Sequence, residues 1–263
     1  MIQDILAFAH EKVSEGRQVV LVTVTDTSGS SPASVGQVMA VLADGTSVGT
    51  VGGGTTEHLI IQRAVEALKN GERVFKFTYN HTEIGMACGG EMSGFGVVMG
   101  SENHLYIFGG GHIAQKLAPL AVATGFFVTV VEDRPDLESA FSGVQYIVSL
   151  PEEYEKKVKM TGSAYVVICT RGHRTDYDAL HFVLTKPTRY VGMIGSRKKV
   201  ASVFDRLREE GFEENVINKI YAPIGLDIAD EIPAEIAVAI LAEILLVKNG
   251  GSPKHKKITG QVD

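Results

Sequence analysis

The stretch that decides the fold of this chain reads LYIFGGGHIA and spans residues 105–114. Its four leading apolar residues predict a short buried strand, and the glycines that follow precede a run that predicts a helix. Gly109 permits a tight turn, Gly111 lets the backbone approach a pyrophosphate, and the small Ala114 allows close helix–strand packing. The helix dipole would face the phosphates. The stretch therefore predicts a dinucleotide-binding turn, with Gly109, Gly111 and His112 beside the ligand.

Two acidic residues, Glu132 and Asp133, stand at the end of the next predicted strand. Glu132 comes 21 residues after Gly111, about where a carboxylate accepts a hydrogen bond from a ribose hydroxyl. This placement favours NAD over NADP. Arg134 leaves two alternatives open, because it would either pair with these acids or meet a phosphate and reverse the preference. A Rossmann-like fold that kept the turn without binding a nucleotide is the third alternative.

From residue 103 onward, short apolar strands alternate with helices. We expect strands at 104–108, 127–131, 144–148, 164–169, 189–194 and 217–221, and helices at 112–124, 151–159, 176–184, 197–210 and 233–247. Strand–helix–strand units at this spacing imply a parallel sheet with right-handed crossovers. Six strands match the doubly wound count. The second half, residues 103–263, is therefore predicted to be a Rossmann-like doubly wound domain.

The first half of the chain has a different pattern. We expect a helix over the first 13 residues and a second one ending near Lys69, with strands at 18–25, 37–42, 46–51, 74–79 and 94–99. The Gly-Ser-Glu-Asn stretch at 100–103 is the expected boundary. The fold class is thus α/β, with a smaller N-terminal α+β domain over residues 1–100.

Composition narrows the class of protein. The chain has 263 residues, of which 44% are hydrophobic, and a net charge of −6, which argues against nucleic acid as a partner. Its two cysteines, Cys88 and Cys169, are too few for a disulfide framework and fit a reducing compartment. The apolar segment 236–247 is interrupted by Glu243 and is too short to span a membrane. We expect a cytoplasmic protein.

Two polar loops, 170–176 and 195–199, follow the fourth and fifth predicted strands, where ligands of open α/β sheets bind. His173 near Asp176 would be an oriented acid–base pair in an enzyme, while the structural alternative is that Asp176 caps a helix. Ser196 and Arg197, at a helix start, would hold an anion. The structural alternative is that residues 197–199 form a solvated first turn.

Motifs along nearly the whole chain resemble the XdhC/CoxI family, accessory factors that mature xanthine dehydrogenase and related molybdenum hydroxylases. The resemblance rests on these stretches in order: GSSP at 29–32, Gly36, Met39, GTVGGG at 49–54, Glu57, CGG at 88–90, FGGGH at 108–112, Ala114, DRP at 133–135, GSRK at 195–198, PIGLD at 223–227, PAEIA at 233–237 and AE at 242–243. Two positions depart from the family pattern, since members often carry Arg at Ala33 and an apolar residue or Cys near Thr55 and Thr56.

The resemblance implies a chaperone-like protein without turnover of its own. Such a protein would bind molybdenum cofactor, protect it while its terminal sulfur ligand is installed, and deliver it to a hydroxylase apoenzyme. The expected partners are that xanthine dehydrogenase-like apoenzyme, a cysteine desulfurase and a second copy of the chain. An NAD(P)-dependent oxidoreductase that uses His173 and Asp176 as a proton relay is the competing hypothesis, and a nucleotide-sensing adaptor is a third.

Molybdenum cofactor is a pterin dithiolene that bears a phosphate, so its binder needs backbone amides that hold an anion. Gly52, Gly53 and Gly54, directly before a helix, would offer such amides. Cys88, the one cysteine of this half, would hold sulfur or molybdenum as its thiolate. A small cysteine packed among glycines is the structural alternative for Cys88. Cys169, inside a predicted strand, is expected to be core.

Overall fold

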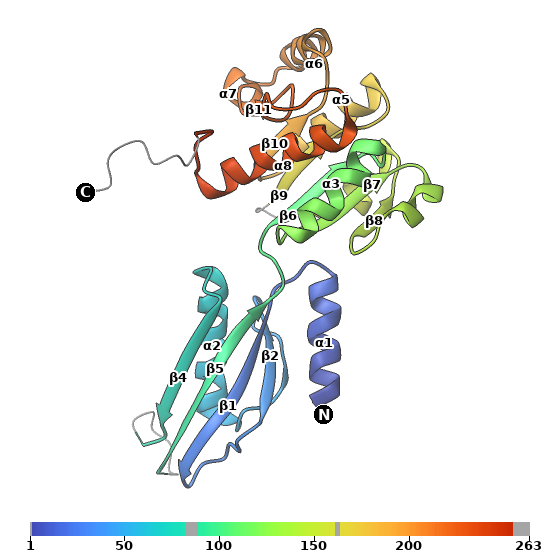
Figure 1. Ribbon diagram of the computed structural model, residues 1–263. Helices are drawn as coiled ribbons and strands as arrows, with labels where there is room; N and C mark the ends of the chain where they lie inside the picture. The colour runs from blue at the N-terminus through green and yellow to red at the C-terminus, as the bar shows by residue number, and fades with distance from the viewer. Residues whose placement is uncertain (1, 83–88, 161–163, 255–263) are drawn as a thin grey trace, which may run out of the picture. The chain divides into compact units, whose positions relative to one another are not determined.

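The structure is a computed structural model, and it describes residues 2–82, 89–160 and 164–254. The chain divides into two compact units between Glu102 and Asn103 (Figure 1). We call residues up to 102 unit 1 and residues from 103 unit 2, and each is described by itself. Within the described residues, no helix is both long and apolar enough to cross a membrane.

Unit 2 is built on a six-stranded sheet with the order β11-β10-β9-β6-β7-β8. The strands are β6 (His104–Phe108), β7 (Phe127–Glu132), β8 (Gln145–Val148), β9 (Ala164–Ile168), β10 (Thr188–Met193) and β11 (Ile220–Tyr221). Every pairing in this sheet is parallel. In chain order the strands run 3-2-1-4-5-6, which is the doubly wound arrangement, with its switch point between β6 and β9. The Rossmann-like prediction is confirmed.

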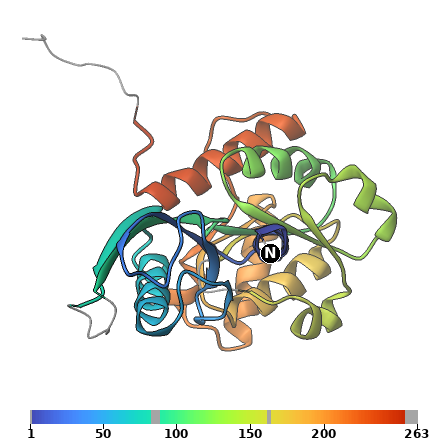
Figure 2. The same cartoon turned by 90° about the horizontal axis from the view of Figure 1, so that it is seen from below.

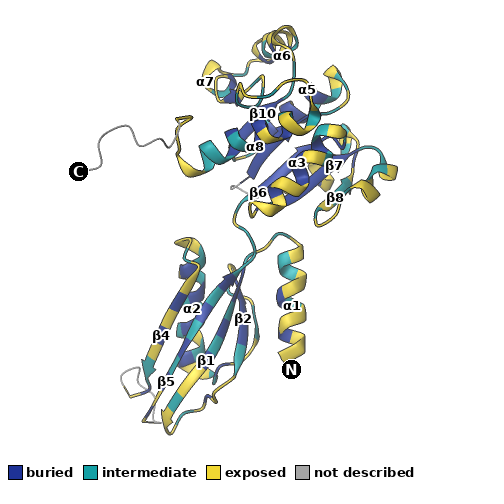
Figure 3. Cartoon of the chain, viewed as in Figure 1, coloured by how far each residue is buried: buried dark blue, intermediate teal, exposed yellow. Residues whose placement is uncertain are grey.

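Helices cover both faces of this sheet, so its four inner strands, β6, β7, β9 and β10, are almost continuously buried (Figure 3). Leu105 and Ile107 of β6 pack with α3 (His112–Ala123) and α8 (Pro233–Asn249). The alternate residues Tyr106 and Phe108 face the opposite core, formed with α5 (His173–Leu184) and α6 (Arg197–Glu209). The period of two along a strand explains this division.

Unit 2 departs from the expected elements at four places. Residues 151–159 form the 3₁₀ turn η2 (Pro151–Glu153) and the single turn α4 (Tyr154–Lys157), because the backbone is already extended at Val158. The expected strand 217–221 is reduced to β11, since α7 (Glu214–Ile217) occupies its beginning. A 3₁₀ helix, η1 (Pro135–Ala140), follows β7, and α5 begins three residues earlier than expected.

Unit 1 is a five-stranded antiparallel sheet with the order β3-β2-β1-β5-β4 and one helix on each face. Its elements are α1 (Ile2–Ser14), β1 (Val19–Gly29), β2 (Val38–Leu42), β3 (Ser47–Gly49), α2 (Gly54–Lys69), β4 (Val74–Asn80) and β5 (Gly90–Met99). Val20 and Val22 pack with α2, and Val19 and Leu21 pack with α1. Figure 2 shows α2 against the curled sheet. The predicted α+β class is confirmed.

The two central strands of unit 1 are longer than the sequence pattern predicted. β1 continues to Gly29 and β5 begins at Gly90, and these two glycines face each other in the ladder. The pattern ended β1 at Thr25 because the residues that follow are polar. A shift of register between Val24 and Asp26 lets the strand continue as a half-exposed ribbon. This extension positions the glycine motifs described next.

Candidate functional site

The glycine turn of unit 2 lies at the carboxyl end of β6. Gly109 has φ of 110°, and a Cβ at this position would strike the backbone carbonyl of Cys169 in the adjacent segment. Only glycine fits this approach. Gly111 has no atom within 4 Å of an added Cβ, so open space lies beside it. It caps α3, and His112, the first residue of that helix, is exposed.

Glu132 points back at this turn and its carboxylate is surrounded by donors. Its Oε2 accepts hydrogen bonds from the Gly110 backbone N–H at 2.5 Å and from Arg134 Nη2 at 2.9 Å. Its Oε1 accepts from the Arg134 Nε at 3.0 Å and from the backbone N–H of Asp133 at 3.0 Å. The side chain is buried, with 5% of its surface exposed. Of the two alternatives for Arg134, the structure forms the pairing with the acid.

These contacts change the acidity of Glu132. Burial disfavours the charged carboxylate, but the hydrogen bonds from Arg134, Asp133 and Gly110 outweigh it and lower its pKa to about 2. Glu132 is therefore ionised at neutral pH and holds the turn, the end of β7 and Arg134 together. Its oxygens are already engaged, so a ribose hydroxyl would have to displace one of these donors.

Asp133 and the loop after β9 form the other side of the crevice. Arg171 donates to Asp133 Oδ2 at 2.6 Å, which connects the loops after β7 and β9. Between these loops lies a narrow cavity lined by Gly109, Glu132 and Thr170 among others. The residues predicted around the nucleotide turn are thus gathered at one edge of the sheet.

Asp176 has partners other than the predicted one. The carboxylate of this fully buried residue accepts hydrogen bonds from the Thr170 backbone N–H at 3.0 Å and the Thr170 hydroxyl at 2.8 Å. It also forms an ion pair with Lys199, whose Nζ donates in addition to the Ile194 carbonyl. His173 is exposed in the first turn of α5, and no hydrogen bond between it and Asp176 is found. Asp176 fastens the loops after β9 and β10.

The start of α6 gives Ser196 a structural role that the sequence pattern did not predict. Ser196 is the N-cap residue, and its hydroxyl accepts a hydrogen bond from the Lys199 backbone N–H at 3.3 Å. Arg197 follows in the first turn and is exposed. The sequence pattern did not predict the role of Lys199. Its position four residues after Gly195 can be read from the sequence, but its partner Asp176 is 23 positions away.

In unit 1, the segments around the motifs of the first half meet at one end of the sheet. A Cβ at Gly90 would lie 2.6 Å from the Ser30 carbonyl, and one at Gly29 would lie 2.8 Å from the Gly89 carbonyl. The loop that begins at Ser30 then leads to Ala33, which lies 3.1 Å from a Cβ built at Gly52. Such close contacts require glycines. They bring Gly89 and Gly90, the GSSP segment and the start of the GGG segment together.

The three glycines 52–54 all have positive φ and lead into α2. Nothing lies within 4 Å of a Cβ built at Gly53 or Gly54, and no side chain caps the helix at Gly53. Glu57 accepts hydrogen bonds from the Thr50 hydroxyl at 2.5 Å and the Val51 backbone N–H at 3.2 Å. Glu57 therefore fixes residues 50 and 51, which lie between β3 and the glycines. The N-terminal end of α2 stays open to an anion.

His81 is a polar residue of this end that sequence reasoning missed. Its side chain is entirely buried, and its backbone N–H donates to the Gly90 carbonyl at 2.8 Å. Among the described residues, neither of its ring nitrogens has a hydrogen-bond partner. An unpaired buried polar group is costly, and a lone histidine after a strand gives no signal of it in sequence.

Of the two cysteines, the structure describes Cys169. Cys88 lies outside the described residues. Cys169 is buried beside the glycine turn, and burial together with the charges of Asp176 and Glu132 raises the pKa of its thiol to about 12. Cys169 is therefore a protonated core residue at neutral pH, in line with the core packing expected from its strand. Within the described residues, no group of three or more His, Cys, Asp or Glu side chains could hold a metal ion.

Comparison with known proteins decides the family. A family model described as the XdhC Rossmann domain matches residues 105–244, more than half of the chain, and one described as the XdhC and CoxI family matches residues 13–80. The chain belongs to the XdhC/CoxI family. The two matched regions fall within unit 2 and unit 1.

Several curated relatives accompany this XdhC/CoxI assignment. Uncharacterized protein YqeB of Escherichia coli strain K12 is 34% identical over 86% of this chain and 43% of its own length. A probable xanthine dehydrogenase subunit of Bacillus subtilis strain 168 is 30% identical over 54% of this chain and 42% of its own length. Molybdenum cofactor insertion chaperone PaoD of Escherichia coli strain K12 is 23% identical over 93% of this chain and 88% of its own length. The chain thus spans less than half of the first two relatives.

A solved structure shows the same fold. A crystal structure described as a xanthine dehydrogenase from Bacillus halodurans matches with a TM-score of 0.52 at 19% identity, covering 94% of this chain and 96% of that one. At this identity the likeness shows the fold alone.

Gly109→Ala and Gly111→Ala form a matched pair at the turn. Gly109→Ala is expected to lower the free energy of unfolding by about 3 kcal/mol, because alanine is strained at positive φ and meets the Cys169 carbonyl. Gly111→Ala is expected to cost less than about 1 kcal/mol, since its Cβ enters open space. Urea unfolding followed by circular dichroism measures both. Equal losses would contradict the geometry.

Glu132→Gln is expected to destabilise the fold in a pH-dependent way. Because the folded pKa of Glu132 is about 2 and its ordinary value 4.5, the ionised form adds stability above pH 4.5 that is lost as the pH falls toward 2. The difference in melting temperature between wild type and Glu132→Gln should therefore be largest above pH 5 and shrink on acidification. Glu138→Gln, at an exposed position of η1, is the control. A pH-independent difference would show that Arg134 does not hold an ionised carboxylate.

Lys199→Met is expected to cost about 3–5 kcal/mol, because it leaves the buried carboxylate of Asp176 without its cation. The double variant Lys199→Met with Asp176→Asn should regain most of that loss, since the buried charge is removed as well. His173→Ala, at an exposed position in the same helix as Asp176, should change stability by less than about 0.5 kcal/mol. Chemical denaturation tests all three, and a double variant as unstable as Lys199→Met would refute the ion pair.

Proposed function

We propose that this chain is a maturation factor of a molybdenum hydroxylase. It binds molybdenum cofactor at the end of the unit 1 sheet where Gly29, Gly52 and Gly90 lie. The observation that carries the proposal is that Gly89 and Gly90, the GSSP segment and Gly52 lie in close contact at one end of the unit 1 sheet. Its membership of the XdhC/CoxI family and its likeness to an insertion chaperone support the same role.

The described residues at this end fit a phosphate-bearing pterin. The uncapped start of α2 supplies backbone N–H groups to the phosphate, and the open space beside Gly53 and Gly54 admits close approach. His81 supplies a buried imidazole whose hydrogen-bonding capacity is unused among the described residues. Cys88, next to Gly89, would supply the thiolate that holds sulfur or molybdenum.

In the same proposal, unit 2 binds a nucleotide at Gly109 and Gly111, and its loops serve delivery rather than turnover. The pairing of Asp176 with Lys199 and Thr170 favours this role over an oxidoreductase, because the carboxylate that would orient His173 is engaged elsewhere. A ribose would compete with Arg134 for Glu132. His112, Asp133, Ser196 and Arg197 remain proposed contacts to that nucleotide.

The partners of the proposal follow from the cargo. A xanthine dehydrogenase-like apoenzyme would receive the cofactor, a cysteine desulfurase would supply the terminal sulfur, and a second copy of the chain would complete a homodimer. The similarity to a molybdenum cofactor insertion chaperone and to a probable xanthine dehydrogenase subunit supports the first of these.

The test is retention of pterin by the purified protein. The chain is isolated from a host that makes molybdenum cofactor, and bound pterin is oxidised and quantified by its fluorescence. We expect stoichiometric pterin in the wild type and at least a tenfold loss in Cys88→Ser. Cys169→Ala is the matched control and should keep its pterin, since Cys169 is a core residue of the other unit.

His81→Leu separates binding from folding at the same end. Because it removes two buried nitrogens that have no partner among the described residues, its melting temperature should equal or exceed that of the wild type, while its pterin content should fall. Absence of pterin from the wild type, together with normal hydroxylase activity in a strain that lacks this chain, would overturn the proposal. Equal loss in Cys88→Ser and Cys169→Ala would overturn the role of Cys88.

A further inference from the structure

A second cavity lies in unit 2 at the sheet edge opposite the glycine turn. Thr188 begins β10 and Ile220 begins β11, whereas Gly109 follows the end of β6. Because parallel strands place their amino ends at one edge, this cavity and the nucleotide turn are separate. It encloses about 520 Å³, within the usual range of small-molecule sites.

The lining combines an apolar floor with positive charge. Leu184, Val191 and Val216 supply aliphatic surface from α5, β10 and α7. Among the described residues that line the cavity are three cations and no carboxylate, the cations being Lys186, Arg189 and Lys219. A positive lining repels metal ions and attracts anions, while the apolar floor favours an organic body over a hydrated inorganic ion.

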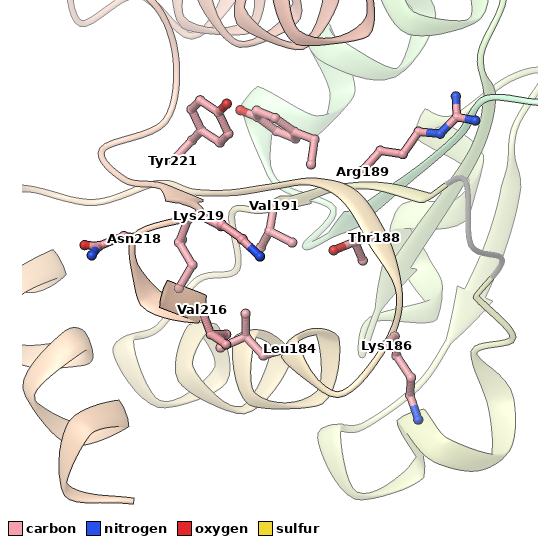
Figure 4. A pocket seen from close by; sticks show the side chains of 11 residues that line it. Leu184, Lys186, Thr188, Arg189, Val191, Val216, Asn218, Lys219 and Tyr221 are labelled. Carbon is pink, nitrogen blue, oxygen red and sulfur yellow. The ribbon is translucent and has the colours of Figure 1, made fainter. Parts of the chain in front are cut away.

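The orientation of the polar groups selects one cation. In Figure 4 the ammonium of Lys219 lies over the cavity near Val191 and the hydroxyl of Thr188 points inward, while the head groups of Lys186 and Arg189 point outward. Lys186 is also engaged with Glu155, whose oxygens lie 2.8 Å from its Nζ. In the described part of the chain, no ion pair is found for the Lys219 ammonium. Lys219 and Thr188 are thus placed to hold one anionic group.

The rings of Tyr190 and Tyr221 lie on the other face of this sheet edge. Tyr190 alternates with Val191 along β10, and Tyr221 pairs in register with Gly192. The two rings stack with their centroids 4.7 Å apart, and the Tyr190 hydroxyl donates to Glu243 of α8 at 2.5 Å. The apolar surface of the cavity is therefore aliphatic and comes from the face that packs with α5 and α7.

We propose that this cavity is a second ligand site, which binds a small organic anion with an apolar body. Lys219 and Thr188 hold the carboxylate or phosphate, and the body lies on Leu184, Val191 and Val216. This site is independent of the cofactor binding proposed for unit 1 and of the nucleotide turn.

The experiment is a titration of the isotope-labelled full chain with indole-3-acetate, a flat carboxylate, followed by amide chemical shifts in NMR spectra. We expect saturable shifts grouped at residues 188–191 and 216–221. The uncharged indole-3-acetamide should bind at least tenfold more weakly, because it has the same shape without the charge. Inorganic phosphate should bind more weakly as well, since it lacks the apolar body.

Variants at the cavity identify the anion contact. Lys219→Met should weaken indole-3-acetate binding at least tenfold, and Lys219→Arg should stay within threefold of the wild type. Lys186→Met, which removes a cation that points outward, is the matched control and should stay within threefold. Both lysines lie at the surface of unit 2, so the spectra should otherwise be unchanged.

Several results would overturn the proposal. One is the absence of a saturable shift at about 10 mM ligand, because a built site would bind more tightly than that. Another is a group of shifts at residues 109–111 instead of at the cavity. Equal binding by Lys219→Met and wild type would refute the anion contact. Inorganic phosphate binding as tightly as indole-3-acetate would refute the apolar body. None of these results bears on pterin retention at unit 1, so the two proposals fail separately.

Discussion

The close pairing of β6 with β9 is the constraint on which unit 2 depends. These neighbours in space are the first and fourth strands of the sheet, and their register places Phe108 beside Ile168. The backbone therefore leaves β6 so near to Cys169 that only a glycine fits at position 109. The loops after β6 and β9 then diverge to opposite faces, and the crevice opens between them. The candidate residues of this unit lie at the carboxyl ends of its strands or in the first turns of the helices that follow them.

Buried charge explains the arrangement of those loops. Glu132 and Asp176 are both buried carboxylates at the carboxyl edge, and neither would be stable there without donors. Glu132 is satisfied by Arg134 and the turn, and Asp176 by Lys199 and Thr170. The acids that look like ligand contacts in sequence thus hold the crevice in shape. Unit 1 uses a different device, because close glycine contacts hold its motif segments and leave His81 unpaired among the described residues.

Much of the fold could be predicted because its signals are local. Alternation of apolar strands and helices is set by residues a few positions apart, and so is the glycine turn. The errors fell where local signals mislead. Polar residues 26–29 read as a loop but continue β1, because pairing with β5 supplies their backbone hydrogen bonds. The expected helix at 151–159 shrank to a 3₁₀ turn and α4, since the chain extends again at Val158 before it enters β9.

The sequence by itself determined the family, the Rossmann-like class of unit 2 and the need for a glycine at position 109, since these follow from residue type and order. The tertiary structure alone decided which groups are partners. Lys199 and Asp176 are 23 positions apart, Arg171 and Asp133 are 38 apart, and His81 lacks a partner among the described residues only because of what the fold brings around it. The cavity at Lys219 likewise joins residues of α5, β10, α7 and β11. Hydrogen bonds and ion pairs act over a few ångströms, and only the folded chain sets those distances.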